Sequence, residues 1–141
     1  MLLTFTAGAQ GLAGKALLEV QSIPSAGGTR MRLHFACPVQ WREQAPAYQG
    51  DSLLILLRLG AECGALVPRR AFRHHAVLPP ALRNQVEDVA LEQDPVHGPR
   101  LIIRFRAVRR FTVQAEREGR ALVLDLAAPA PVSTDKKRKT P

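Results

Sequence analysis

The fold class is decided by the octapeptide GTRMRLHF at residues 28–35, which returns as GPRLIIRF at residues 98–105. In the first copy, Met31, Leu33 and Phe35 alternate with polar residues. Because successive side chains of an extended chain point to opposite faces, this alternation gives one apolar face and one wet face. The period of two predicts a half-buried β-strand, and the offset of 70 residues between the copies predicts a duplicated motif.

A second pair of segments extends the repeat through both halves. The segment GDSLLILL at residues 50–57 matches GRALVLDL at residues 119–126 after a one-residue slip, and Trp41 falls on Phe111. Glycine-containing turns separate the expected strands at residues 26–28, 49–51, 98–99 and 118–119. We therefore predict an all-β fold, a β-sandwich of seven to eight short strands built from a duplicated β-motif.

Two segments depart from the alternating pattern. Residues 53–57 are apolar at every position, which is typical of a central strand covered on both faces. Residues 65–84 have no clear period, so we expect a long crossover between the two halves. The prolines near residues 79–83 leave room in it for one helical turn at most.

The chain of 141 residues suits one domain with a single core, and we expect this domain to span residues 17–127. Residues 1–16 contain the cleavage-like pattern Ala7-Gly8-Ala9 but lack the basic and long apolar regions of a complete signal peptide. They are interpreted as a partial signal peptide or as a disordered N-terminus. Residues 128–141 are rich in Ala and Pro before a basic run, and they are predicted to be a disordered basic tail or linker. The apolar runs are too short for a transmembrane helix, which needs about 20 residues.

The chain is basic, with 20 Lys and Arg against 12 Asp and Glu and a net charge of +8. Such a charge favours anionic partners, including nucleic acid, anionic lipid and the carboxylates of peptidoglycan. Guanidinium groups can bind a carboxylate or phosphate through two parallel hydrogen bonds. A further basic group, Arg69, Arg70 and Arg73, lies in the predicted crossover. The candidate ligand-binding residues are Arg30, Arg32, Arg104, Arg106, Arg109 and Arg110. The alternative interpretation is a solvated sheet face whose charges discourage aggregation.

The two cysteines follow two predicted strands. Cys37 comes after the strand that ends at Phe35, and Cys63 comes after the strand that ends near Leu59. If these strands are neighbours, the Cα atoms can lie within the about 4.4–6.8 Å that a disulfide requires. We expect a Cys37–Cys63 disulfide, and the alternative is two small buried thiols that never meet. No C-x-x-C pair is present, so we expect no metal site.

Catalytic motifs are missing from the sequence. There is no G-x-S-x-G elbow, no phosphate-binding or dinucleotide-binding glycine loop, and the acidic pair Glu87-Asp88 is adjacent rather than converging. The neighbouring histidines His74 and His75 would point to opposite sides of an extended chain. We therefore expect no enzyme activity, no catalytic residue and no cofactor.

The segments RLHFACPVQW at residues 32–41 and QGDSLLILL at residues 49–57, with residues 98–105 and 120–126, resemble an AMIN-like N-terminal β-domain. This is the domain of Gram-negative envelope proteins that precedes tetratricopeptide repeats or a SPOR module. The similarity covers about residues 17–127. AMIN domains are β-sandwiches that place periplasmic amidases and type IV pilus secretins at the cell wall. The resemblance therefore implies a periplasmic, non-catalytic localisation domain that binds peptidoglycan or an envelope protein complex, while the arginine site above rests on clustering alone.

Two functional hypotheses from different classes follow from these features. The leading one is a periplasmic binding or localisation domain that uses arginines against anionic cell-wall groups. The alternative is a basic cytosolic nucleic-acid-binding protein, which the net charge of +8 favours. Aromatic residues that could stack on bases are nearly missing beside the arginines, which argues against the alternative.

Overall fold

A computed structural model describes residues 16–65 and 72–128 of the chain. In these ranges lie eight strands: β1 (Leu17–Ser25), β2 (Gly28–Phe35), β3 (Val39–Ala45), β4 (Gln49–Leu59), β5 (Phe72–His75), β6 (Val86–Asp94), β7 (Gly98–Ala115) and β8 (Ala121–Ala127). Helical structure in the same ranges is limited to two short 3-10 turns, η1 (Ala61–Ala65) and η2 (Pro80–Leu82). The predicted all-β class and number of strands are confirmed. The predictions for residues 1–15 and 129–141 fall outside the described residues.

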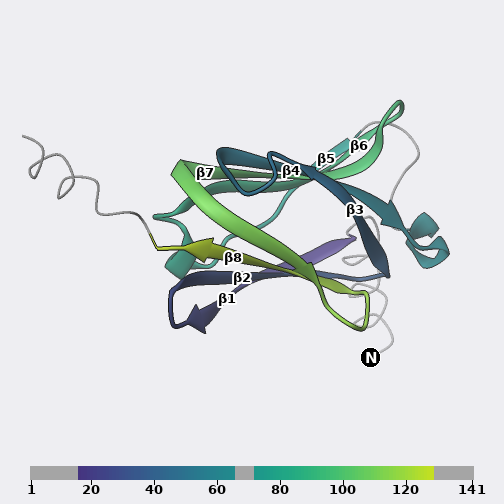
Figure 1. The fold of residues 1–141 in the computed structure, drawn as a ribbon. Helices are drawn as coiled ribbons and strands as arrows, with labels where there is room; N and C mark the ends of the chain where they lie inside the picture. Colours follow the sequence, from purple (N-terminus) through teal and green to yellow (C-terminus); the bar gives the residue numbers. More distant parts are fainter. Residues whose placement is uncertain (1–15, 66–71, 129–141) are drawn as a thin grey trace, which may run out of the picture.

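All strand pairs are antiparallel, and the strands follow the order β1-β2-β8-β7-β4-β3, with β6 on β7 and β5 on β6. The first part of β7 pairs with β4 and β6, and its last five residues pair with β8. Figure 1 shows β1, β2 and β8 in one layer and β4, β5 and β6 in another, with β7 running between them. The packing of these layers as a β-sandwich stays a prediction.

Strand β7 is longer than the short strands that the sequence predicts. It runs without a break for 18 residues, from Gly98 to Ala115. The reason is local, because no glycine or proline occurs between Leu101 and Ala115 to interrupt the ladder. Arg109 and Arg110, at the middle of the strand, still pair with the start of β4.

The repeated sequence pattern is matched by repeated strand pairing. Leu33 of β2 lies opposite Leu122 of β8, and the corresponding residues Ile103 and Leu53 lie opposite each other in β7 and β4. Two further pairs of the first half recur in the second. The pair Val20 and Leu33 corresponds to Val89 and Ile103, and the pair Trp41 and Leu57 corresponds to Phe111 and Leu126. The two halves therefore use the same registers. They also pair with each other in a reciprocal way, since β8 of the second half pairs with β2 of the first, and β4 of the first half pairs with β7 of the second.

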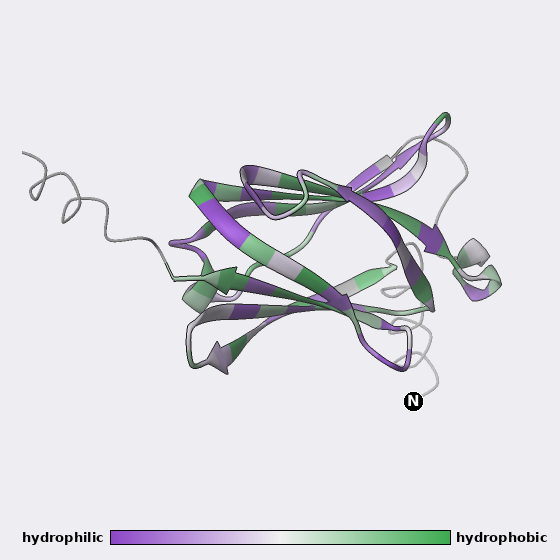
Figure 2. Cartoon of the chain, viewed as in Figure 1, coloured by the Kyte–Doolittle hydropathy of each residue, from purple (hydrophilic) through white to green (hydrophobic). Residues whose placement is uncertain are grey.

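The apolar faces predicted from the alternation form one core. Met31, Leu33 and Phe35 are fully buried, whereas the residues between them are partly exposed. Residues from all the long strands join the same buried cluster, including Leu122 of β8 and Ile103 of β7. Figure 2 shows the alternation as purple and green bands along β7.

Strand β4 is central, as residues 53–57 predict, but the predicted cover on both faces is wrong for the described part of the chain. Leu53, Ile55 and Leu57 are buried in the core, while Leu54 and Leu56 on the other face are partly exposed. Arg100 lies opposite Leu56 and is ion-paired to Glu92. The aliphatic part of the arginine can shield the leucine, so a second covering layer is not required.

The predicted crossover contains a strand that the sequence pattern did not reveal. Within residues 65–84, β5 pairs with β6, with His75 opposite Ala90. Four residues are too few to show a period of two clearly, which explains the miss. The predicted single helical turn is confirmed as η2, and its Leu82 is fully buried. Residues 66–71, which include Arg69 and Arg70, lie outside the described residues.

Cys37 and Cys63 form the disulfide that the sequence predicts. Their Cα atoms are 5.4 Å apart and their sulfur atoms lie at bonding distance. Both side chains are buried, Cys37 between β2 and β3 and Cys63 in η1. The bridge ties η1 to the start of β3, so the end of β4 is held against the neighbouring strand.

Candidate anion-binding site

The six predicted arginines do not share one surface, and Arg32 is already engaged on the outer face of β2. Its Nε and Nη2 atoms donate hydrogen bonds to Glu116 at 2.7 and 2.9 Å, and Nη1 donates to Gln21 at 3.2 Å. The hydrogen bonds to Glu116 raise the pKa of Arg32, and the same bonds lower the pKa of the Glu116 carboxyl. A guanidinium held by a carboxylate in this way is poorly suited to bind a second one.

Arg104 lies on a different face, on the outer side of β7. Its strand neighbours in register are Ser52 of β4 and Asp88 of β6. The side chain is exposed and forms no hydrogen bond or ion pair with the residues that the structure describes. Arg104 lies two residues before Arg106 on the same exposed face of β7, but it lines neither of the two pockets described next.

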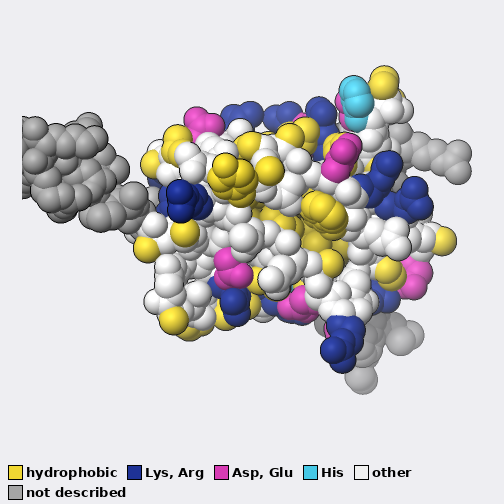
Figure 3. All heavy atoms as spheres, in the orientation of Figure 1, with side chains coloured by type: hydrophobic (Ala, Val, Ile, Leu, Met, Phe, Trp, Pro, Cys, Tyr) yellow, Lys and Arg dark blue, Asp and Glu magenta, His cyan; other side chains and the backbone are white. Residues whose placement is uncertain are grey.

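The remaining four arginines meet at one end of the molecule, and we call Arg30, Arg106, Arg109 and Arg110 the arginine end. Arg30 and Arg110 line a pocket of about 600 Å³, and Arg106 and Arg109 line a second pocket of about 460 Å³. Gly28 lines both pockets, so they adjoin. This end carries the bend of β7 and the β1–β2 turn, at the left of Figure 1, and Figure 3 shows dark blue basic side chains there.

Arg109 is buried, with 6% of its surface exposed. Its Nη1 atom donates to Oε1 of Gln85 at 2.8 Å and its Nη2 atom donates to the carbonyl of Ala127 at 2.6 Å. Both acceptors are neutral, and Nε has no hydrogen-bond partner among the described residues. Burial lowers the pKa of the Arg109 guanidinium, because its charge has lost water and no described carboxylate replaces it. An anion beside Arg109 would offset this cost.

The pocket beside Arg109 is lined by hydrogen-bond donors. Thr29 Oγ1 donates to the same Gln85 oxygen at 3.0 Å, which fixes the amide and leaves its Nε2 group free to donate elsewhere. Arg106 donates from Nε to the carbonyl of Arg83 at 2.6 Å, so its two Nη groups have no partner within the described ranges. Neither Asp nor Glu occurs among the described residues that line this pocket. The arrangement is chemically suited to a carboxylate or phosphate.

The adjoining pocket is less positive. Arg30 donates to Asp125, with Nε at 2.7 Å from Oδ1, and this contact raises the pKa of Arg30. Arg110 is exposed and has only a long hydrogen bond of 3.4 Å to Gln49 among the described residues. Tyr48, which is 66% exposed, completes the wall. Arg110 is therefore the available cation on this side of the arginine end.

Sequence reasoning missed the neutral residues of the site, namely Gln85, Asn84 and Tyr48. They lie in connections between strands, where side chains no longer alternate between two faces. The sequence therefore does not predict which of these connections come together in the fold. The signal for Arg109 was present, however. It lies in phase with Phe105 and Phe111 at even spacing along β7, and all three residues are buried.

A second buried charged residue, Glu92 of β6, differs from Arg109 because it forms ion pairs with side chains of opposite charge. It accepts hydrogen bonds from Arg73 at 2.7 Å and from Arg100 at 2.6 Å, and 7% of the residue is exposed. Burial alone raises the pKa of Glu92, but the two arginines outweigh it and hold the pKa below the ordinary 4.5. Arg73, which belongs to the basic group of the predicted crossover, thus pairs with a carboxylate of the neighbouring strand β6.

We expect Glu92→Gln to lower the free energy of unfolding by about 1–2 kcal/mol at pH 7, since it removes charge-assisted hydrogen bonds. A carboxylate with a depressed folded pKa stabilises fully above its unfolded pKa, and it loses this contribution as the pH falls through the folded value. The difference between parent and variant should therefore shrink below about pH 4.5. Urea unfolding at neutral and acid pH measures it, and a difference that persists unchanged at pH 3 would contradict the ion pair.

Within residues 16–65 and 72–128, no group of three or more His, Cys, Asp or Glu side chains could hold a metal ion. In the same part of the chain, neither helical turn has the length and apolar character needed to cross a membrane. The chain matches no protein-family model, no curated protein and no solved structure. The assignment of function therefore rests on the residues of the chain itself.

Proposed function

We propose that the chain is a non-catalytic binding domain whose arginine end captures carboxylate groups of an anionic cell-wall polymer. The observation that carries the proposal is Arg109, a buried guanidinium with neutral acceptors, beside the exposed Arg106 in a pocket lined by donors. A site of this kind gains more from an anion than a solvated surface arginine does, because its charge is already desolvated.

The proposed location is the periplasm, with peptidoglycan or an envelope complex as the partner. A buried Cys37–Cys63 disulfide supports an oxidising compartment. The resemblance of residues 17–127 to AMIN-like domains leads to the same proposal, since those domains place other proteins at the cell wall.

Nucleic acid is the weaker candidate for the same site. Single-stranded nucleic acid is held by aromatic side chains that stack on bases as well as by cations. Among the described residues, the aromatic ones that line the two pockets of the arginine end are Tyr48 and Phe111, and Phe111 is 2% exposed. Within the described lining, only Tyr48 is exposed enough to stack on a base, which supports an anionic polymer over nucleic acid as the partner.

Co-sedimentation with purified peptidoglycan sacculi tests the proposal. We expect Arg106→Ala with Arg110→Ala to weaken binding about tenfold, because each exposed arginine supplies a charge-assisted hydrogen bond. The matched control is Arg104→Ala with Arg117→Ala, which removes the same charge from exposed positions outside both pockets.

Equal losses in the two double variants would mean that binding follows net charge and not the arginine end. Sacculus binding by the first variant at the parental level would refute the site. Tighter binding to DNA than to sacculi, with a steep dependence on salt, would favour the nucleic-acid alternative.

A further inference from the structure

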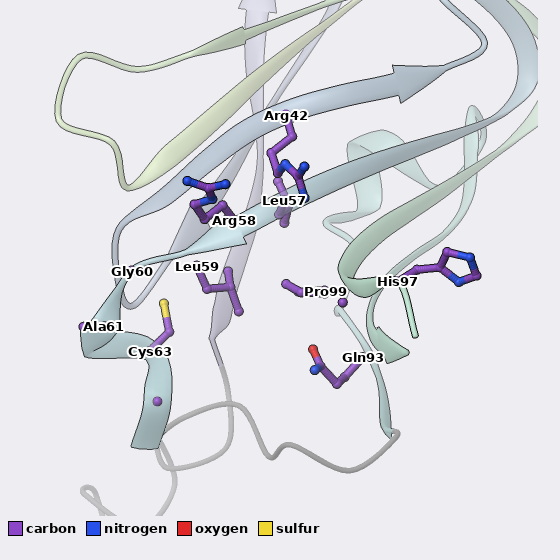
Figure 4. Close-up of a pocket in the computed structure, with 12 residues that line it drawn as sticks. Arg42, Leu57, Arg58, Leu59, Gly60, Ala61, Cys63, Gln93, His97 and Pro99 are labelled. Carbon is purple, nitrogen blue, oxygen red and sulfur yellow. The ribbon is translucent and has the colours of Figure 1, made fainter. Parts of the chain in front are cut away.

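A pocket of about 360 Å³ lies away from the arginine end, between the end of β4, η1 and the β6–β7 turn. It is the pocket drawn in Figure 4, and in Figure 1 these elements lie on the right, opposite the bend of β7. Figure 3 shows dark blue basic side chains on that side as well. No described residue lines both this pocket and a pocket of the arginine end.

The duplicated motif relates this pocket to the one beside Arg110. Leu57 and Gly98, which line the first, correspond in the repeat to Leu126 and Gly28, which line the second. The matching registers of the two halves place these residues alike in their sheets. Corresponding residues of the motif thus line a pocket in both halves, but the polar side chains that line the two pockets differ.

The polar side chains of this pocket include two arginines that have no ionic or hydrogen-bonding partner among the described residues. Arg42 and Arg58 are exposed and form no hydrogen bond or ion pair with any residue in the described ranges. No acidic residue occurs among the described lining residues. A carboxylate at the mouth would therefore meet two guanidinium groups and no opposing charge.

The pocket also contains a buried acceptor without a donor. The Oε1 atom of Gln93 is shielded from solvent and accepts no hydrogen bond from the described residues. In Figure 4 its amide points toward the space between Leu59 and Pro99, whereas His97 points away. Buried polar atoms are nearly always hydrogen-bonded, so this oxygen favours a ligand that brings an N–H or O–H group.

We propose that this pocket binds the carboxyl-terminal end of a short peptide. Small side chains of the peptide would pack on the partly exposed Leu59 and Pro99, one amide N–H would donate to Gln93 Oε1, and the terminal carboxylate would bind Arg58 and Arg42. A fatty acid offers apolar surface and a carboxylate but no donor, and a sugar acid offers donors but little apolar surface. A peptide terminus supplies all three. The inference does not depend on the proposed function, because the two sites share none of the described residues.

Titration of the oxidised full chain with N-acetyl-trialanine, followed by amide NMR spectra, tests the inference. We expect saturable shifts at Gly60, Gly64 and Gly98, with a dissociation constant in the millimolar range that suits a small ligand. Arg58→Ala should weaken this binding about tenfold, and so should replacing the peptide carboxylate by an amide. Arg110→Ala is the matched control and should leave the affinity unchanged.

A second variant, Gln93→Leu, separates binding from folding. It removes the unpaired acceptor, so it should weaken the peptide while leaving the thermal midpoint equal to or above that of the parent. Equal affinity for the carboxylate and amide forms of the peptide, shifts confined to the arginine end, or no saturation by about 10 mM peptide would each overturn the inference.

Discussion

Truncation of Leu122 to alanine is expected to lower the free energy of unfolding by about 3–5 kcal/mol, and Leu53→Ala should do the same. Leu122 is fully buried and Leu53 is 1% exposed. They occupy corresponding positions of the repeat, opposite Leu33 and Ile103. Each truncation removes apolar contacts and leaves a cavity that the surrounding strands can fill only in part.

Equilibrium denaturation of the two variants measures this prediction. If the two halves contribute equally to one core, the two losses should agree within about 1 kcal/mol. Leu54→Ala, on the partly exposed outer face of β4, is the control and should cost less than half as much. A loss at Leu54 as large as that at Leu53 would contradict the assignment of the buried face.

The second large effect is expected on binding, not on stability. Arg109→Met should weaken binding to sacculi about a hundredfold, which corresponds to about 2.7 kcal/mol. The free energy of unfolding should stay within about 1 kcal/mol of the parent or rise, because methionine removes a buried charge that has no carboxylate partner among the described residues. Gln85 keeps the hydrogen bond from Thr29, and Ala127 is exposed, so its carbonyl can bind water.

Denaturation and sacculus co-sedimentation on the same preparation separate the two effects. A loss of several kcal/mol in stability would show that Arg109 supports the fold through its hydrogen bonds to Gln85 and Ala127. Undiminished binding by a stable Arg109→Met protein would mean that the buried guanidinium does not contact the ligand.

The sequence predicts the core of this protein well because strand alternation reports burial directly. Met31, Leu33 and Phe35 are buried as their period of two requires. The repeat also relates long-range contacts to one another. Once Leu33 is known to lie opposite Leu122, the repeat predicts that Ile103 lies opposite Leu53, as it does. Strand β5 was missed because its four residues are too few to show a period.

The candidate site was harder to predict. The alternation of apolar and polar residues predicts which face of a strand a side chain lies on, but it does not predict which residues of other strands lie beside it. Arg32 looks free in the sequence, yet its partner Glu116 lies 84 residues further along the chain. Arg104 and Arg106 lie two residues apart on the exposed face of β7, yet of the two only Arg106 lines a pocket of the arginine end. Only the register of the folded sheet reveals which arginines keep a free guanidinium.

The most direct test of the arginine end is to follow the arginine Nε–Hε NMR signals while soluble disaccharide-peptide fragments of peptidoglycan are added. We expect the signals of Arg106, Arg109 and Arg110 to shift together and to saturate, while those of Arg32 and Arg104 stay in place. Saturating shifts at Arg32 or Arg104 without change at Arg109, or unchanged spectra at full ligand excess, would contradict the account.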